Sequence, residues 1–180
     1  MRKTKSQKVA LCGVLAALSV VILLLGNLLQ IGTYCAPMLA SFLLVPILVE
    51  YGANFAMLLY ITVSVLSLLL VPDKELALFY VLVLGYYPVL QWRLQRVKPT
   101  ALRWLAKFAV FNVAVLALYA LLLGLMAPPE LVAEFAEMGT PMLVALLAVG
   151  NFAFWACDRA LLAFTLLYHV KFRPKFKKYL

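Results

Sequence analysis

The sequence predicts an all-α integral membrane protein with six transmembrane helices in one bundle and both termini cytoplasmic. Of its 180 residues, 67% are hydrophobic and 13% charged, whereas a soluble domain is about half apolar and about a quarter charged. Long apolar runs recur along the whole chain without the alternating pattern of a membrane β-barrel. The basic residues form three clusters, each beside an apolar run, which is typical of cytoplasmic loops.

The first half of the single domain 1–180 contains four apolar runs, which predict spans at about 9–29, 35–49, 53–71 and 76–91. The first run is longer than the apolar region of a typical signal peptide and no small-x-small cleavage site follows it, so we assign it as a helix. The second is short and contains Pro37 and Pro46. In the fourth, Gly85 and Pro88 predict a kink near Tyr86 and Tyr87.

The second half predicts two more spans, at about 105–126 and 140–168. Pro128 and Pro129 end the first of them, because proline cannot continue a helix. Glu130, Glu134 and Glu137 follow without a basic residue. Their spacing places them on one face of a short surface helix, where we interpret them as solvated.

The stretch 92–107 fixes the topology, because it contains five basic residues and no acid. The segments 1–8 and 171–180 are also basic, whereas the loops near 73 and 130 are neutral or acidic. Placing the three basic segments inside requires even numbers of crossings between them, and four followed by two satisfies this. In a five-span alternative, the run 35–49 is re-entrant, and the stretch 92–107 would then face outside.

Several function classes are disfavoured. The net charge of +9 does not indicate nucleic-acid binding, because the basic clusters flank spans and form no separate basic domain. Cys12, Cys35 and Cys157 lie far apart and form no metal-ligand pattern. No serine–base set, metal set or carboxylate pair indicates catalysis. We therefore expect no enzyme activity, no metal and no cofactor, with a membrane enzyme kept as a remote alternative.

Asp158 and Arg159 are the charged residues well inside an apolar run, near the cytoplasmic end of the last span. Charges in a bilayer are costly and often functional, so Asp158 is a candidate coupling or proton-relay carboxylate. The alternative is structural. Asp158 then pairs with a base such as Arg103 or Lys107, and Arg159 extends to the interface.

A second polar set lies in the last three spans. Asn151 shares a helix face with Trp155 and Asp158, Asn112 and Tyr119 lie on the fifth span, and Tyr80 is one of three tyrosines on the fourth. These residues are candidates to line a cavity for a small molecule. The alternative is hydrogen bonding and packing between helices.

Small residues form a stripe on the first helix. Ala10, Gly13 and Ala17 recur at i, i+3 and i+7, with Cys12 and Ala16 beside them. Such stripes let another helix approach closely. The alternative is packing within the bundle.

The chain length, the six predicted spans, the stripe and the opening sequence KVALCGVLAALSVV at residues 8–21 resemble the substrate-binding (S) components of energy-coupling factor (ECF) transporters. The resemblance implies that the first helix docks, through an Ala-xxx-Ala motif, on a membrane coupling subunit driven by two ABC-type ATPases. Here Gly13 takes the place of the first alanine and pairs with Ala17. A metal-binding version would have an N-terminal histidine, and residue 2 is Arg2, so the implied substrate is a vitamin or related small organic molecule.

By this resemblance, the site lies in the outer loops and outer helix ends, with Asn27, Gln30 and Tyr34 in a mobile lid. The implied substrate-binding residues are Asn27, Gln30, Tyr34, Tyr80, Tyr119 and Asn151, and the partner-docking residues are Ala10, Gly13 and Ala17. The prediction is a multi-pass uptake subunit of the cell membrane. The alternative is a membrane interaction or assembly protein that holds partners or anionic lipid and has no ligand site.

Overall fold

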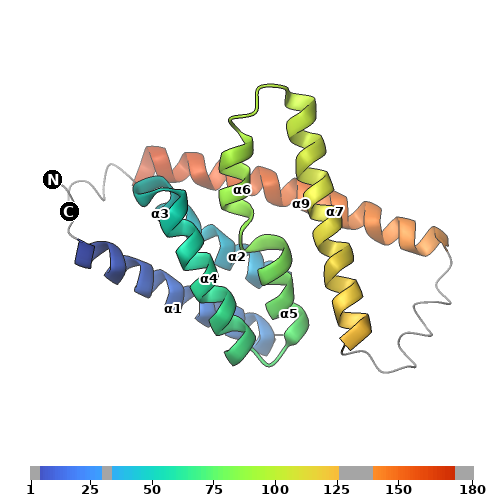
Figure 1. The fold of residues 1–180 in the computed structure, drawn as a ribbon, viewed down its shortest axis with the longest axis horizontal. Helices are drawn as coiled ribbons and strands as arrows, with labels where there is room; N and C mark the ends of the chain where they lie inside the picture. Colours follow the sequence, from blue (N-terminus) through green and yellow to red (C-terminus); the bar gives the residue numbers. More distant parts are fainter. Residues whose placement is uncertain (1–4, 30–33, 126–139, 173–180) are drawn as a thin grey trace.

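The structure is a computed structural model that describes residues 5–29, 34–125 and 140–172, and within these ranges it is helical with no strand (Figure 1). Gln30 lies outside the described residues. The elements are α1 (Lys5–Leu29), α2 (Cys35–Phe42), α3 (Leu44–Tyr51), α4 (Ala53–Leu70), α5 (Lys74–Phe79), the π-turn η1 (Tyr80–Leu84), α6 (Tyr87–Leu94), α7 (Thr100–Leu125), α9 (Thr140–Leu167) and the π-turn η2 (Tyr168–Phe172).

The helices confirm the predicted α-helical, multi-pass membrane class. Five helical stretches are long and apolar enough to cross a membrane: Lys8–Leu29, Ala53–Leu70, Lys74–Leu94, Thr100–Gly124 and Val144–Phe172. The sixth, Cys35–Tyr51, is shorter. At about 1.5 Å per residue it measures about 25 Å, a few ångström less than the roughly 30 Å hydrocarbon core.

Prolines explain where two of these stretches are interrupted. Pro46 cannot donate to the carbonyl of Phe42, four residues earlier, and α2 ends at Phe42. Pro88 likewise leaves the carbonyl of Leu84 without its usual donor, and η1 ends there. The helix resumes as α6 at Tyr87, which confirms the predicted irregularity near Tyr86 and Tyr87.

The basic stretch 92–107 differs from its prediction as a loop. The connection between α6 and α7 spans only residues 95–99, and α7 begins at Thr100 rather than near residue 105. The amide of Arg103 donates to the carbonyl of Pro99 at 3.1 Å and closes the first turn. Alanine, leucine, arginine and lysine, which make up most of the following residues, all have high helix propensity, so the positive charges do not prevent a helix. Similarly, α1 begins at Lys5 rather than at residue 9.

Contacts at the two ends of the molecule show how the helices of the first half alternate in direction. The Lys8 ammonium lies 5.5 Å from the ring centre of Tyr51, where α3 turns into α4. At the opposite end, Tyr34 contacts Phe79 of α5, with ring centres 5.1 Å apart. The beginning of α1 and the end of the α9–η2 stretch lie on the same side of the molecule (Figure 1). The assignment of that side to the cytoplasm remains a prediction from charge.

Two buried clusters form the core, and the stretch Lys74–Leu94 takes part in both. Leu76, Ala77 and Tyr80 pack with α1, α3 and α4. Beyond the π-turn, Leu84 and Tyr87 pack with α7 and α9. In Figure 1, α9 crosses α6 and α7 steeply instead of running alongside them.

Candidate functional site

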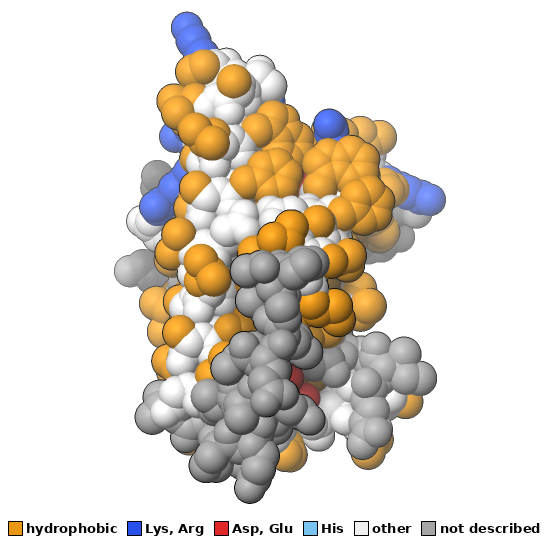
Figure 2. All heavy atoms as spheres, turned by 90° about the vertical axis from the view of Figure 1, so that its right-hand side faces the viewer, with side chains coloured by type: hydrophobic (Ala, Val, Ile, Leu, Met, Phe, Trp, Pro, Cys, Tyr) orange, Lys and Arg blue, Asp and Glu red, His pale blue; other side chains and the backbone are white. Residues whose placement is uncertain are grey.

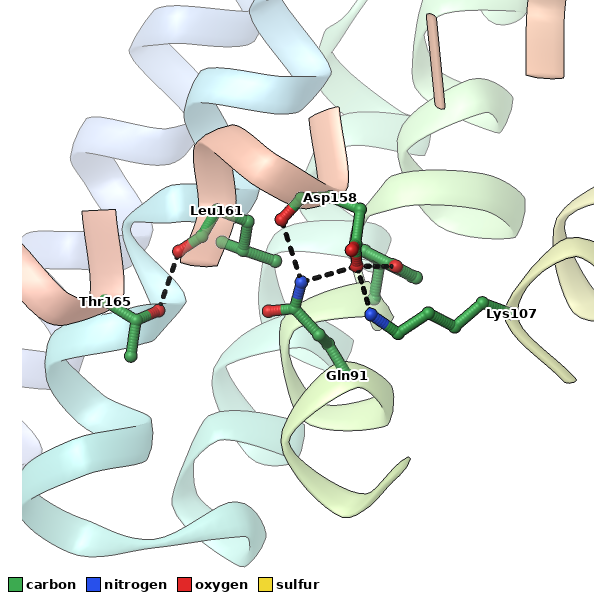
Figure 3. A network of polar contacts seen from close by, with 6 residues as sticks. Gln91, Lys107, Asp158, Leu161 and Thr165 are labelled. Atoms are coloured by element: carbon green, nitrogen blue, oxygen red, sulfur yellow. Dashed lines mark hydrogen bonds and ion pairs between the residues drawn. The ribbon is translucent and has the colours of Figure 1, made fainter. Parts of the chain in front are cut away.

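A buried polar cluster joins three helices at Asp158, whose side chain has no exposed surface. Its Oδ1 accepts hydrogen bonds from Lys107 Nζ at 2.5 Å, from Gln91 Nε2 at 2.6 Å and from the hydroxyl of Tyr87. Gln91 Nε2 also donates to the backbone oxygen of Asp158 at 3.1 Å. Figure 3 shows Gln91 and Lys107 approaching Asp158 from different helices.

Helix geometry brings the cluster together. Tyr87 and Gln91 are four residues apart on α6 and therefore share a face. Lys107 comes from α7 and Asp158 from α9. The cluster lies where α9 crosses the other two helices, so it fixes the position of the crossing.

The cluster behaves electrostatically as a compensated ion pair. Lys107 is 3% exposed, and burying either charge alone would be strongly unfavourable. This confirms the structural alternative in which Asp158 pairs with a base, and it selects Lys107 over Arg103. Asp158 Oδ2 is buried without a hydrogen-bond partner among the described residues. A proton-relay role for Asp158 is a separate hypothesis that the contacts leave untested.

Arg159, the residue after Asp158, is exposed. Its guanidinium carbon lies 5.5 Å from the ring centre of Trp104 and 5.8 Å from that of Trp155. Tryptophan is the residue that most favours a membrane–water interface. That Arg159 extends to the interface stays a prediction.

A second polar contact joins α7 and α9 through a pair of asparagines. Asn112 Nδ2 donates to Asn151 Oδ1 at 2.9 Å, and Asn151 Nδ2 donates to Asn112 Oδ1 at 3.1 Å. Each amide also donates to a carbonyl of its own helix, that of Phe108 or Leu147, at 2.8 Å. The hydrogen-bonding alternative for these residues is therefore observed.

A third polar group lies at the opposite end, where Tyr34 donates to Glu75 Oε1 at 3.1 Å. Tyr119 of α7 is a further side-chain hydrogen-bond neighbour of Tyr34. Partial desolvation of the otherwise exposed Tyr34 side chain, together with Tyr119 and Glu75, raises the pKa of the Tyr34 phenol above its ordinary value. Asp73 caps α5 beside them by accepting from the amides of Glu75 and Leu76. This outer cluster, defined as Tyr34, Glu75, Phe79 and Tyr119, combines a carboxylate with aromatic rings.

The predicted substrate-binding residues are thus only partly brought together. Tyr34 and Tyr119 meet in the outer cluster, and Asn27 is half-buried near the end of α1. Tyr80 is completely buried in the first core cluster. The side-chain amide of Asn151 is hydrogen-bonded to that of Asn112.

The stripe on α1 faces away from the other described helices. Ala10, Gly13 and Ala17 are exposed, and a Cβ added to Gly13 would meet no atom of the described residues within 4 Å. Ala16 on the other face is buried against the first core cluster. The alternative of packing within the bundle therefore holds for Ala16 but not for Ala10, Gly13 and Ala17.

Two residues of these sites were missed by sequence reasoning. Gln91 was assigned only as the end of a span, although a glutamine four residues after Tyr87 in an apolar run is a signal for a buried polar face. Glu75 was assigned to a loop. No single-sequence pattern links it to Tyr34, which is 41 residues away.

A small cavity of about 30 Å³ lies beside the Asp158 cluster and has Gln91, Gln95, Thr165 and His169 in its wall. This volume suits about one water molecule rather than a vitamin-sized ligand. Within the described ranges, no group of three His, Cys, Asp or Glu residues is placed to hold a metal ion. No protein-family model, curated protein or solved structure matches the chain.

Proposed function

We propose that this protein is a substrate-binding subunit of the cell membrane that takes up a small organic molecule, such as a vitamin or related micronutrient. In this proposal, α1 docks on a membrane coupling subunit that is driven by two ABC-type ATPases. The single observation that carries the proposal is the outward-facing stripe of Ala10, Gly13 and Ala17. The resemblance to ECF S components supplies the identity of the partner.

The stripe supports docking of a helix for a steric reason. Small side chains let two backbones approach closely, and membrane helices associate through such packing rather than through exclusion of water. A helix that faced only lipid would gain nothing from small residues, since lipid tails accommodate large side chains equally well. The open space above Gly13 gives an incoming helix room to make contact.

The outer cluster supports a ligand at the opposite end of the bundle. Tyr34 and Tyr119 are exposed, and Glu75 beside them is half-buried. Aromatic rings with a few hydrogen-bonding groups are typical of small-molecule sites. The proposed ligand contacts are therefore Tyr34, Glu75 and Tyr119, whereas Tyr80 and Asn151 support the fold.

The test of docking compares two identical substitutions. Gly13→Leu fills the open space on the stripe, and Gly124→Leu makes the same change on α7, where a Cβ also meets no atom within 4 Å. Tagged protein from the native host is purified in mild detergent, and co-purified ATPases are quantified. We expect wild type and Gly124→Leu to retain the ATPases and Gly13→Leu to lose them. Recovery of no ATPase with the wild-type protein refutes the coupling module.

The second candidate is a membrane interaction protein without a ligand site. It is favoured by the hydrogen bonds that the candidate ligand residues make within the protein. Asn112 and Asn151 bond each other reciprocally, and Tyr34 donates to Glu75. Mass spectrometry of small molecules released from purified protein distinguishes the two candidates. A bound organic molecule that is lost from Tyr34→Phe but kept by Asn151→Ala supports uptake, and its absence from wild type supports the second candidate.

A further inference from the structure

Arg159 lies near two tryptophans, and no acidic residue in the described part of the chain pairs with it. Its guanidinium lies over the rings of Trp104 from α7 and Trp155 from its own helix. Within the described ranges, the ion pair recorded is Lys107–Asp158, and it does not include Arg159. The two rings fix the position of the guanidinium, and its N–H donors have no recorded hydrogen-bond acceptor in those ranges.

The charge near Arg159 is net positive, because Asp158 and Lys107 neutralise each other and Arg159 keeps its own charge. Arg103 precedes Trp104, and Lys107 follows one turn later, also close to the Trp104 ring. The adjacent carboxylate, Asp158, is buried and neutralised by Lys107. Figure 2 shows Lys and Arg gathered toward the upper part of a face that is otherwise mainly apolar. An occupant of this place must therefore carry negative charge and tolerate apolar surroundings.

We propose that Arg159, Trp104 and Trp155 form a binding site for the phosphate of an anionic phospholipid. Guanidinium presents paired N–H donors that match two phosphate oxygens. Tryptophan favours the depth where acyl chains meet headgroups. The exposed apolar side chains Leu105 and Phe152 lie on the same two helices as the rings and can contact the chains. Basic pockets between membrane helices are suited to such headgroups.

The test measures lipid binding to the purified full-length protein by native mass spectrometry, with phosphatidylglycerol and phosphatidylcholine as probes. Arg159→Gln removes the charge, and we expect about fivefold weaker binding of phosphatidylglycerol. Trp155→Leu removes one ring and keeps the charge, and we expect about threefold weaker binding. Phosphatidylcholine binding is expected to change less than twofold in both variants.

The matched control is Arg96→Gln. Arg96 also lies over a tryptophan, Trp92, at 4.1 Å, but over one ring only. Loss of phosphatidylglycerol binding by Arg159→Gln and Trp155→Leu, but not by Arg96→Gln, supports the site. Equal loss in Arg96→Gln shows that general surface charge attracts the lipid, and wild-type binding by Arg159→Gln and Trp155→Leu shows that no lipid is held there. Either result overturns the proposal.

Discussion

The ammonium of Lys107 lies 2.5 Å from Oδ1 of Asp158, and both side chains are buried although the residues are 51 positions apart. A buried ion pair contributes little compared with a well-packed apolar pair, but removing one partner leaves an uncompensated charge. Removing one of the two charged side chains should therefore lower the stability more than replacing both.

Replacing Lys107 with methionine should strongly destabilise the protein. The variant leaves the carboxylate of Asp158 buried without its counter-ion, a loss of about 3–5 kcal/mol in unfolding free energy. The double variant Lys107→Met/Asp158→Asn should recover most of it, since asparagine keeps an acceptor for Tyr87 and Gln91 without the charge. Thermal unfolding in detergent measures both. Equal stability of the single and double variants would contradict a charge effect.

The asparagine pair should behave as one unit. Asn112→Ala and Asn151→Ala each remove the same two interhelical hydrogen bonds, so the double variant should lose little more than either single variant. We expect a coupling energy of about 0.6 kcal/mol, typical of membrane helices. A cycle of Asn112→Ala with Thr165→Ala is the control, because Thr165 bonds only within α9, to Leu161 at 2.8 Å. That control cycle should be additive.

Gly85→Ala should destabilise the π-turn. A Cβ at Gly85 would lie 2.7 Å from the backbone oxygen of Tyr80 and 2.8 Å from the ring of Tyr60. The backbone atom cannot move aside as a flexible side chain can, so we expect a loss of about 1–3 kcal/mol. Gly13→Ala, where the added atom meets nothing within 4 Å, should be neutral in unfolding experiments. Similar melting temperatures for the two variants would refute the tight contact.

Tyr34 should make stability sensitive to high pH. Because its pKa is raised in the folded protein, the folded state holds the phenolic proton more tightly than the unfolded state. This contribution is complete below the unfolded pKa of about 10 and is lost as pH rises above it. Tyr34→Phe should therefore lose less stability than wild type between pH 9 and about 11. Parallel pH curves for the two proteins would contradict the shift.

The helical membrane class could be predicted because it depends on summed hydropathy, which can be read directly from the sequence. The pairing of Asp158 with a base could also be predicted, since a charge in an apolar run needs a partner. The choice of Lys107 could not, because it depends on where α9 crosses α7.

The contacts within the outer cluster could not be predicted from the sequence. Glu75 looked like an ordinary loop residue, and its contact with Tyr34 depends on how α2 and α5 pack at that end. Tyr80 looked equivalent to Tyr86 and Tyr87 in the sequence, but Tyr80 packs with α1 and α4, whereas Tyr87, beyond the π-turn, packs with α7 and α9. A local change in helical geometry of this kind has no reliable signature in one sequence.

The π-turn at Tyr80–Leu84 accommodates one residue more per turn than an α-helix does. One residue corresponds to a rotation of about 100° around the helix axis. Without that residue, Tyr87 and Gln91 would rotate away from Asp158 while Leu76 and Tyr80 kept their places. The length of this segment is therefore under stricter constraint than its composition: a one-residue deletion there is expected to be more damaging than most substitutions.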